Sequence, residues 1–120
     1  MQTNNITDTR AISISKKVVQ AAIETLGDKL DKVILYGSYA RGDYDHESDI
    51  DFFILADVPQ EETSMLREDV RNCIPYIDLD YDITVSLHVT GKAVFNKFVN
   101  TLPFYMNVVR EGIVLNGQGF

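Results

Sequence analysis

Two acidic residues spaced two apart follow a glycine–serine turn, and together they could carry phosphate and metal chemistry. The turn is Gly37-Ser38, and the acidic pair is Asp49 and Asp51, which precede an apolar run at 52–55. Successive side chains of a strand point to opposite faces, so the two carboxylates share one face. Such a pair suits Mg²⁺, which binds one or two carboxylates together with substrate phosphates.

A third carboxylate from a neighbouring strand would complete an oxygen cage for divalent ions. Asp82 is the first candidate, because it opens the alternating part of a strand expected over 79–88, opposite the apolar side chains. Asp80 has the same parity and is the alternative. Two ions about 4 Å apart can activate an attacking oxygen and stabilise a leaving one. Asp49, Asp51 and Asp82 are therefore the candidate catalytic and metal-binding residues.

The glycine–serine turn could hold the phosphates of a nucleotide. Gly37 lets the chain turn sharply after a buried strand and lets a phosphate approach the backbone. Ser38 can cap a short helix and donate its hydroxyl to a phosphate oxygen, beside the free N–H groups of the helix N-terminus. Arg41 is either a ligand of the triphosphate or an ion-pair partner of the acidic loop after it. Ser48 is either a phosphate contact or a hydrogen-bonding residue of that loop.

The elements around these residues predict an α+β sandwich, with helices packed on one face of a small mixed sheet and the acidic side chains on the other. Thr90 is expected to cap a third helix, and Pro103 to begin a fourth helix that ends at Gly112. Apolar spacing predicts the first two helices at 11–26 and 60–74. We expect strands at 32–36, 49–55, 79–88 and 113–115.

Length, charge and cysteine content limit the classes of function. A chain of 120 residues predicts one domain, at 11–120, after a polar and flexible N-terminus at 1–10. The net charge of −7 argues against broad nucleic-acid binding, which needs a basic face. No apolar run approaches the roughly 20 residues of a membrane span. With a single cysteine and no signal-peptide pattern, we expect a cytoplasmic protein.

The motif Gly-Ser-Tyr-Ala-Arg-Gly at 37–42, followed by Ser-Asp-Ile-Asp at 48–51, resembles the minimal nucleotidyltransferases (MNT) of the DNA polymerase β superfamily. The order of elements supports the resemblance from about residue 11 to 115, and it implies the fold of that superfamily. It further implies that the glycine and serine of the turn bind nucleotide phosphates and that the paired aspartates hold two Mg²⁺ ions. Asp82 would then complete the site as general base for the attacking hydroxyl.

The resemblance also implies a partner and a reaction. Many such small proteins are encoded beside a helical HEPN-domain toxin and act as its antitoxin, so the implied reaction transfers AMP from ATP to a partner tyrosine. The alternative is a non-catalytic module that neutralises a helical partner by occlusion. Transfer to a small molecule such as an aminoglycoside is disfavoured, since antibiotic-modifying relatives carry a second domain that shapes the acceptor pocket. The sequence leaves a homo-oligomer open.

Overall fold

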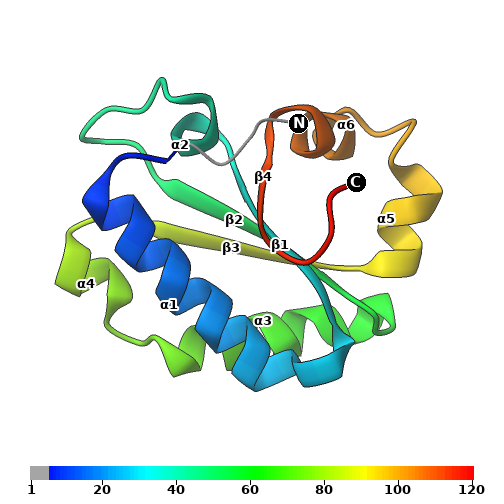
Figure 1. The fold of residues 1–120 in the computed structure, drawn as a ribbon. Helices are drawn as coiled ribbons and strands as arrows, with labels where there is room; N and C mark the ends of the chain where they lie inside the picture. The colour runs from blue at the N-terminus through cyan, green and yellow to red at the C-terminus, as the bar shows by residue number, and fades with distance from the viewer. Residues whose placement is uncertain (1–5) are drawn as a thin grey trace.

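A computed structural model describes residues 6–120, which are built around one four-stranded sheet (Figure 1). The strands β1 (Leu30–Tyr36), β2 (Ile50–Ala56), β3 (Val85–Gly91) and β4 (Ile113–Asn116) lie in the order β3-β2-β1-β4. β1 is antiparallel to both of its neighbours, whereas β2 and β3 are parallel. The sheet is therefore mixed, and together with its helices it confirms the predicted α+β class.

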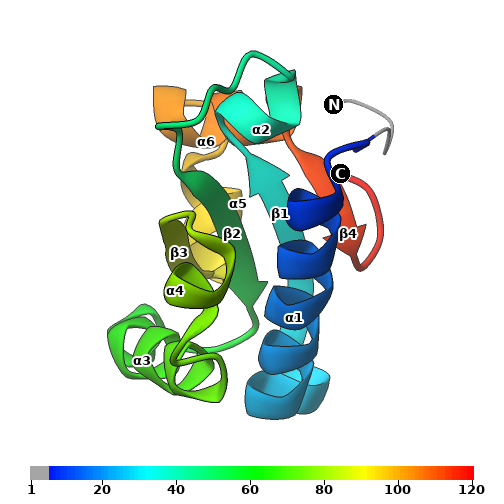
Figure 2. The same ribbon diagram turned by 90° about the vertical axis from the view of Figure 1, so that its left-hand side faces the viewer.

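Three helices cover one face of the sheet. α1 (Thr9–Leu26), α3 (Thr63–Cys73) and α4 (Ile77–Tyr81) pack against this face, as Figure 2 shows from the side. Their apolar side chains form one core with alternate strand residues such as Phe52 and Leu87. Removing this apolar surface from water stabilises the fold by about 25 cal/mol per Å². The predicted packing of helices on one face holds for these three elements.

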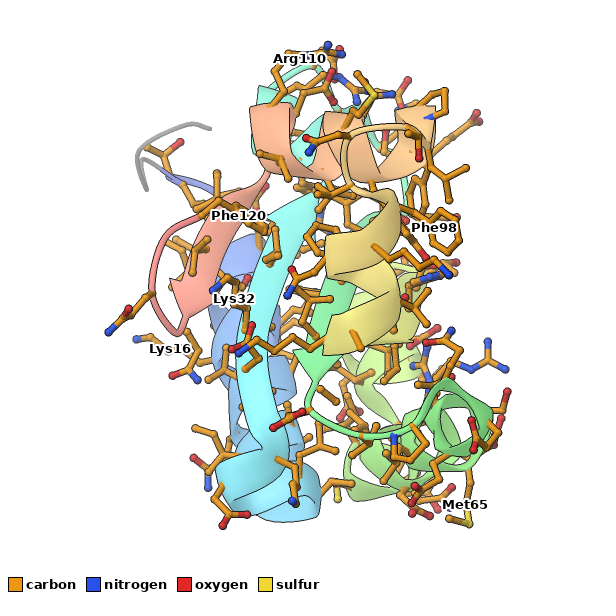
Figure 3. All side chains as sticks on the ribbon, turned by 90° about the vertical axis from the view of Figure 1, so that its right-hand side faces the viewer. Lys16, Lys32, Met65, Phe98, Arg110 and Phe120 are labelled. Atoms are coloured by element: carbon orange, nitrogen blue, oxygen red, sulfur yellow. The ribbon has the colours of Figure 1, made fainter. Side chains whose placement is uncertain are left out.

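Two further helices cover part of the opposite face. α5 (Lys92–Phe98) and α6 (Pro103–Glu111) pack over a smaller core that includes Ile34 and Phe53 (Figure 3). The helices are thus not confined to one face, and the expected open face is open only in part. Asp51, at the start of β2, lies on this second face and stays partly exposed.

Short helical segments join the main elements. α2 (Ser38–Arg41) follows β1 directly, at the end of the sheet where β2 begins. The 3-10 turns η1 (Gly27–Lys29) and η2 (Gln60–Glu62) precede β1 and α3. No helix within residues 6–120 combines the length and the apolar character that crossing a membrane requires.

Two helix starts differ from the prediction. The first helix begins at Thr9 instead of residue 11, because the Asp8 carboxylate accepts a hydrogen bond from the Ala11 N–H at 2.9 Å. Of the N-terminus expected to be flexible, residues 1–5 lie outside the described part of the chain. The prediction that Thr90 caps the third helix is wrong. Thr90 is fully buried in β3, and α5 begins only after Gly91.

The third strand departs most from the prediction. Residues 77–81 form α4, and the strand begins at Val85 rather than at residue 79. Asp82 follows α4 in the left-handed conformation, with φ at 53°, so it ends a helix instead of alternating along a strand. The alternation of apolar and polar residues before position 85 does not distinguish a strand from one helical turn. The helix makes a contact that no local pattern contains, because Arg10 of α1 donates a hydrogen bond to the Tyr81 carbonyl at 3.3 Å.

An ion pair closes the outer edge of β3 where the strand starts. Arg71 of α3 donates a hydrogen bond to Asp78 at 2.8 Å, and Asp78 also accepts from the Val85 N–H at 3.2 Å. Arg71 donates in addition to the Val85 carbonyl. Because β3 is an edge strand, these side chains replace the backbone partners that a further strand would supply. The same contacts hold α4 against the sheet.

We expect the substitution Asp78→Ala to lower the free energy of unfolding by about 1–2 kcal/mol. It leaves the Val85 N–H and the Arg71 guanidinium without their acceptor, and the site is partly exposed, which limits the loss. Urea denaturation measures the change. Asp80→Ala is the matched control on the exposed side of the same helix, where we expect less than about 0.5 kcal/mol. Equal losses in the two variants would contradict the edge-closing role.

Candidate active site

The backbone of the glycine–serine turn lies against the Asp51 carboxylate. Antiparallel pairing sets Tyr36 opposite Asp51, so the turn after Tyr36 comes beside the start of β2. Gly37 has φ at 78°, and a Cβ atom built on it would lie 2.5 Å from Asp51 Oδ2. A side chain at position 37 would therefore need both an unfavourable backbone conformation and a displaced carboxylate. The structure brings the predicted phosphate turn and the acidic pair together.

Asp49 and Asp51 interact through their charges. Asp49 is exposed just before β2, and Asp51 is half-buried two residues later. Burial raises the pKa of Asp51, the charge of Asp49 raises it further, and the nearby Arg41 lowers it. Two like charges held close together favour a cation between them or a proton on one of them. The donor set of this pair fits a hard divalent ion such as Mg²⁺, which prefers carboxylate oxygens.

The structure does not bring Asp82 to the pair. Among the described residues, no three Asp, Glu, His or Cys side chains are placed to hold one metal ion. Asp82 is exposed and directly follows α4 in the sequence, and Asp80 is exposed within that helix. The expected carboxylate triad is absent from residues 6–120, because β3 starts only after the turn that contains Asp82. The general-base role of Asp82 stays a prediction that this geometry does not favour.

Ser86 is the residue of β3 that stands beside Asp51. In the parallel pair of β2 and β3, Asp51 is opposite Ser86, and Phe53 is opposite His88. The rings of Phe53 and His88 stack with their centroids 5.0 Å apart, which shows that these partners share a face. Ser86 lies between the buried Val85 and Leu87, so alternation along β3 places it on the other face of the strand. Only the strand register shows that Ser86, and not Asp82, meets the acidic pair.

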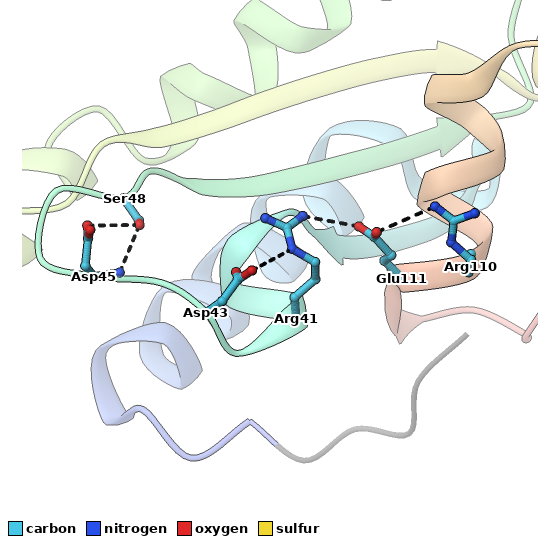
Figure 4. A network of polar contacts seen from close by, with 6 residues as sticks. All are labelled: Arg41, Asp43, Asp45, Ser48, Arg110 and Glu111. Carbon is cyan, nitrogen blue, oxygen red and sulfur yellow. Dashed lines mark hydrogen bonds and ion pairs between the residues drawn. The ribbon is translucent and has the colours of Figure 1, made fainter.

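Arg41 is held by two acidic side chains (Figure 4). Its Nε donates to Asp43 at 3.1 Å, and its Nη1 donates to Glu111 at 3.2 Å. These contacts favour the ion-pair role among the two predicted for Arg41. Glu111 ends α6, 70 residues away in sequence, and no local pattern could have indicated that it reaches the turn. The network connects α2 to α6 across the site.

Ser48 stabilises the loop before β2 (Figure 4). Its hydroxyl accepts from the Asp45 N–H at 3.0 Å and donates to Asp45 Oδ1 at 3.2 Å. The same carboxylate accepts from the Glu47 N–H at 2.9 Å. The hydrogen bonds that the Asp45 carboxylate accepts lower its pKa, and the bond from the Glu47 N–H has the largest effect. The contacts favour the loop-stabilising role of Ser48. They orient the loop that leads directly into the acidic pair.

A cavity of about 190 Å³ opens between the turn and α6. Its walls include Tyr36, Gly37, Phe104 and Glu111. The Phe104 ring is 40% exposed and packs edge-on against Tyr36, with the ring centroids 5.6 Å apart. Burial and the charge of Asp51 raise the pKa of Tyr36 to about 12, so its hydroxyl remains protonated at neutral pH. The cavity thus offers aromatic rings and the ion pair of Arg41 with Glu111 beside the Gly37 turn.

Comparison with known proteins assigns the family. A sequence profile of the nucleotidyltransferase domain matches residues 16–115. The chain belongs to this family. Two curated proteins of Methanocaldococcus jannaschii, MJ0141 and MJ0604, provisionally named protein adenylyltransferases, are each 38% identical to it over 94 and 100 residues. These matches cover 78% and 83% of this nucleotidyltransferase and 93% and 92% of the relatives.

Solved toxin–antitoxin structures contain chains of similar fold. A toxin–antitoxin with AMP-PNP matches with a TM-score of 0.52 at 21% identity, over 87% of this chain and 73% of the other. A complex of tri-AMPylated Shewanella oneidensis HEPN toxin with MNT antitoxin matches with a TM-score of 0.50 at 19% identity, over 90% and 73%. At these identities the similarity concerns the fold, and it confirms the nucleotidyltransferase core implied by the sequence resemblance.

We expect Gly37→Ala to destabilise this nucleotidyltransferase by about 1–3 kcal/mol, because it combines backbone strain with a clash against Asp51. Displacement of that carboxylate should also abolish any rise in melting temperature caused by Mg-ATP. Gly42→Ala is the matched control, since Gly42 has φ at 89° but nothing within 4 Å of an added Cβ. That variant should lose stability and keep its response to Mg-ATP. An unchanged response in Gly37→Ala would contradict the contact.

We expect Asp51→Asn to stabilise the metal-free protein at pH 7. The pKa of Asp51 in the folded protein is raised above the 3.8 of an ordinary carboxyl. The folded state is therefore favoured by the protonated carboxyl, and this stabilisation is lost as pH rises through the folded-state pKa. A neutral amide avoids that loss. We expect the gain in the free energy of unfolding to lie at the lower end of about 0.5–2 kcal/mol, because the site is partly solvated. Thermal unfolding in EDTA should show the gain at pH 7 and little difference below the unfolded-state pKa.

The control for this charge effect is Asp80→Asn, which removes one acidic charge from the exposed surface of α4. It should leave the melting temperature nearly unchanged at both pH values. A melting temperature of Asp51→Asn below that of the unmodified protein at pH 7 would show that the carboxylate stabilises the fold, contrary to this reasoning.

Proposed function

We propose that this nucleotidyltransferase transfers AMP from ATP to a tyrosine hydroxyl of a helical HEPN-type protein and acts as its antitoxin. The observation that carries the proposal is the contact of the Gly37 turn with Asp51, beside Asp49. The names of the two archaeal relatives support transfer to a protein. The AMPylated HEPN toxin in a structure of similar fold supports the kind of acceptor.

The roles of the residues follow from their positions. Asp49 and Asp51 would hold Mg²⁺, as one or two ions, which supplies charge neutralisation at the phosphates when bound. The open backbone at Gly37 lets the triphosphate lie close to the pair, and the Ser38 hydroxyl can donate to a phosphate oxygen. The acceptor oxygen attacks the α-phosphorus, and the bond to pyrophosphate breaks. The hydroxyl proton is released, so the products are the AMP ester, pyrophosphate and a proton.

An exposed apolar surface lies next to this site. Along α5 and α6 and between them, four apolar side chains are 36–44% exposed: Phe98, Leu102, Phe104 and Met106. Phe104 also lines the cavity beside the turn, so the surface is continuous with the site. Large apolar side chains at a surface favour contact with another protein. A partner seated on α6 would lie beside this cavity, because Phe104 and Glu111 of α6 line it.

The test is incubation of the chain with α-labelled ATP, Mg²⁺ and the helical protein encoded beside it. We expect label on a tyrosine of the partner, located by mass spectrometry. Asp49→Asn and Asp51→Asn should each lower the rate at least about 100-fold, equal to about 2.7 kcal/mol of transition-state stabilisation. Asp82→Asn is the acidic control and should retain most of the rate. No transfer by the unmodified chain, or an equal loss in Asp82→Asn, would contradict the proposed site.

The exposed apolar surface also fits a second candidate function, occlusion of a helical partner without catalysis. The double variant Asp49→Asn with Asp51→Asn separates the two functions in a growth assay with the partner expressed. Loss of protection supports AMP transfer as the antitoxin mechanism. Full protection would contradict it and would show that occlusion is sufficient.

A further inference from the structure

Ser86 lies at the point where a neighbouring strand comes closest to the acidic pair. The parallel register sets it directly opposite Asp51, and both side chains are half-buried on the same face. Opposed residues of neighbouring strands lie about 5 Å apart, within reach of a shared ion. Ser86 is therefore the β3 side chain best placed to meet a ligand held by Asp51.

The acidic residues that precede β3 in the chain, at 78–82, are either paired or exposed. Asp78 is the acceptor for Arg71 and for the Val85 N–H, and Asp80 and Asp82 are exposed on and after α4. Within β3 itself, from Val85 to Gly91, there is no acidic residue. The strand that borders the site thus offers it a neutral hydroxyl.

Basic residues lie on the outer side of the same serine. A cavity of about 200 Å³ at the edge of β3 is lined by Arg67, Glu68, Arg71, Ser86 and Leu87. Arg71 is paired with Asp78, whereas Arg67 is half-exposed and its nearest carboxylate, on Glu68, is 4.0 Å away. Because each arginine has an acidic partner, this side of Ser86 carries balanced charges, in contrast to the acidic pair on the other side. The two sides of the serine therefore differ in electrostatic character.

We propose that Ser86 occupies the third protein position of the metal site and that its neutral hydroxyl keeps the affinity for free divalent ions low. This inference rests on the proposed function, because it concerns the same site. Affinity of oxygen sites for divalent ions depends on the number of charged ligands, and Mg²⁺ completes its shell readily with substrate phosphates. The metal ion then binds together with the nucleotide and is not retained after the nucleotide leaves.

The test is a titration with Mn²⁺ alone, followed by the electron paramagnetic resonance of the free ion. Ser86→Asp should bind Mn²⁺ at least about tenfold more tightly than the unmodified chain, because it adds a charged ligand beside Asp51. Ser64→Asp adds the same charge on the exposed surface of α3 and is the matched control. In EDTA, Ser86→Asp should melt below Ser64→Asp, and Mn²⁺ should remove that difference. Equal affinities of the two variants would overturn the proposal.

A second variant keeps the charge of the site constant, in case a third carboxylate prevents folding. Asp49→Asn should weaken Mn²⁺ binding, and Asp49→Asn with Ser86→Asp should restore most of it, because a carboxylate at position 86 replaces the one removed. Failure to restore binding in a folded double variant would overturn the placement of Ser86. The titration contains neither ATP nor acceptor. Absence of AMP transfer would therefore contradict the proposed function while leaving this result intact.

Discussion

The approach of the Gly37 backbone to the Asp51 carboxylate is the constraint on which the site depends. It requires a residue without a side chain after β1, a positive φ at that residue, and a fixed register between β1 and β2. The register is held by the packing of the central strand β2, whose residues Phe52 and Phe53 are fully buried in cores on opposite faces. Slippage by one residue would turn these side chains to the wrong faces, so the packing of the sheet also holds the phosphate turn at the carboxylate.

The acidic pair is unfavourable by itself and is kept by the structure around it. Burial and the neighbouring charge of Asp49 both raise the pKa of Asp51, so the ionised pair destabilises the metal-free fold. Arg41 partly offsets this charge while it joins the turn to Asp43 and to Glu111 at the end of α6. Such opposition between local stability and function is common at sites prepared for a cation or a phosphate.

The family assignment and the geometry together define what is particular to this nucleotidyltransferase. The family profile spans residues 16–115, which include the turn and the acidic pair. The structure adds that the strand beside the pair presents Ser86, with arginines behind it, and that aromatic rings border the cavity below α6. Under the proposed function, a neutral third position would leave the metal ion to arrive with the nucleotide phosphates, and the exposed apolar surface would receive the acceptor protein.

Local sequence patterns determined much of this protein. The Gly37 turn, the charge interaction of Asp49 with Asp51, the α+β class and most helices could be predicted, because each depends on residues a few positions apart. Tertiary structure decided the rest: the replacement of a strand by α4, the burial of Thr90, the pairing of Arg41 with Glu111, and the meeting of Ser86 with Asp51. Each of these depends on strand register or on contacts between distant segments. Periodicity along the chain carries no information on how far one strand is shifted against the next, and that shift decides which residue of β3 lies opposite Asp51.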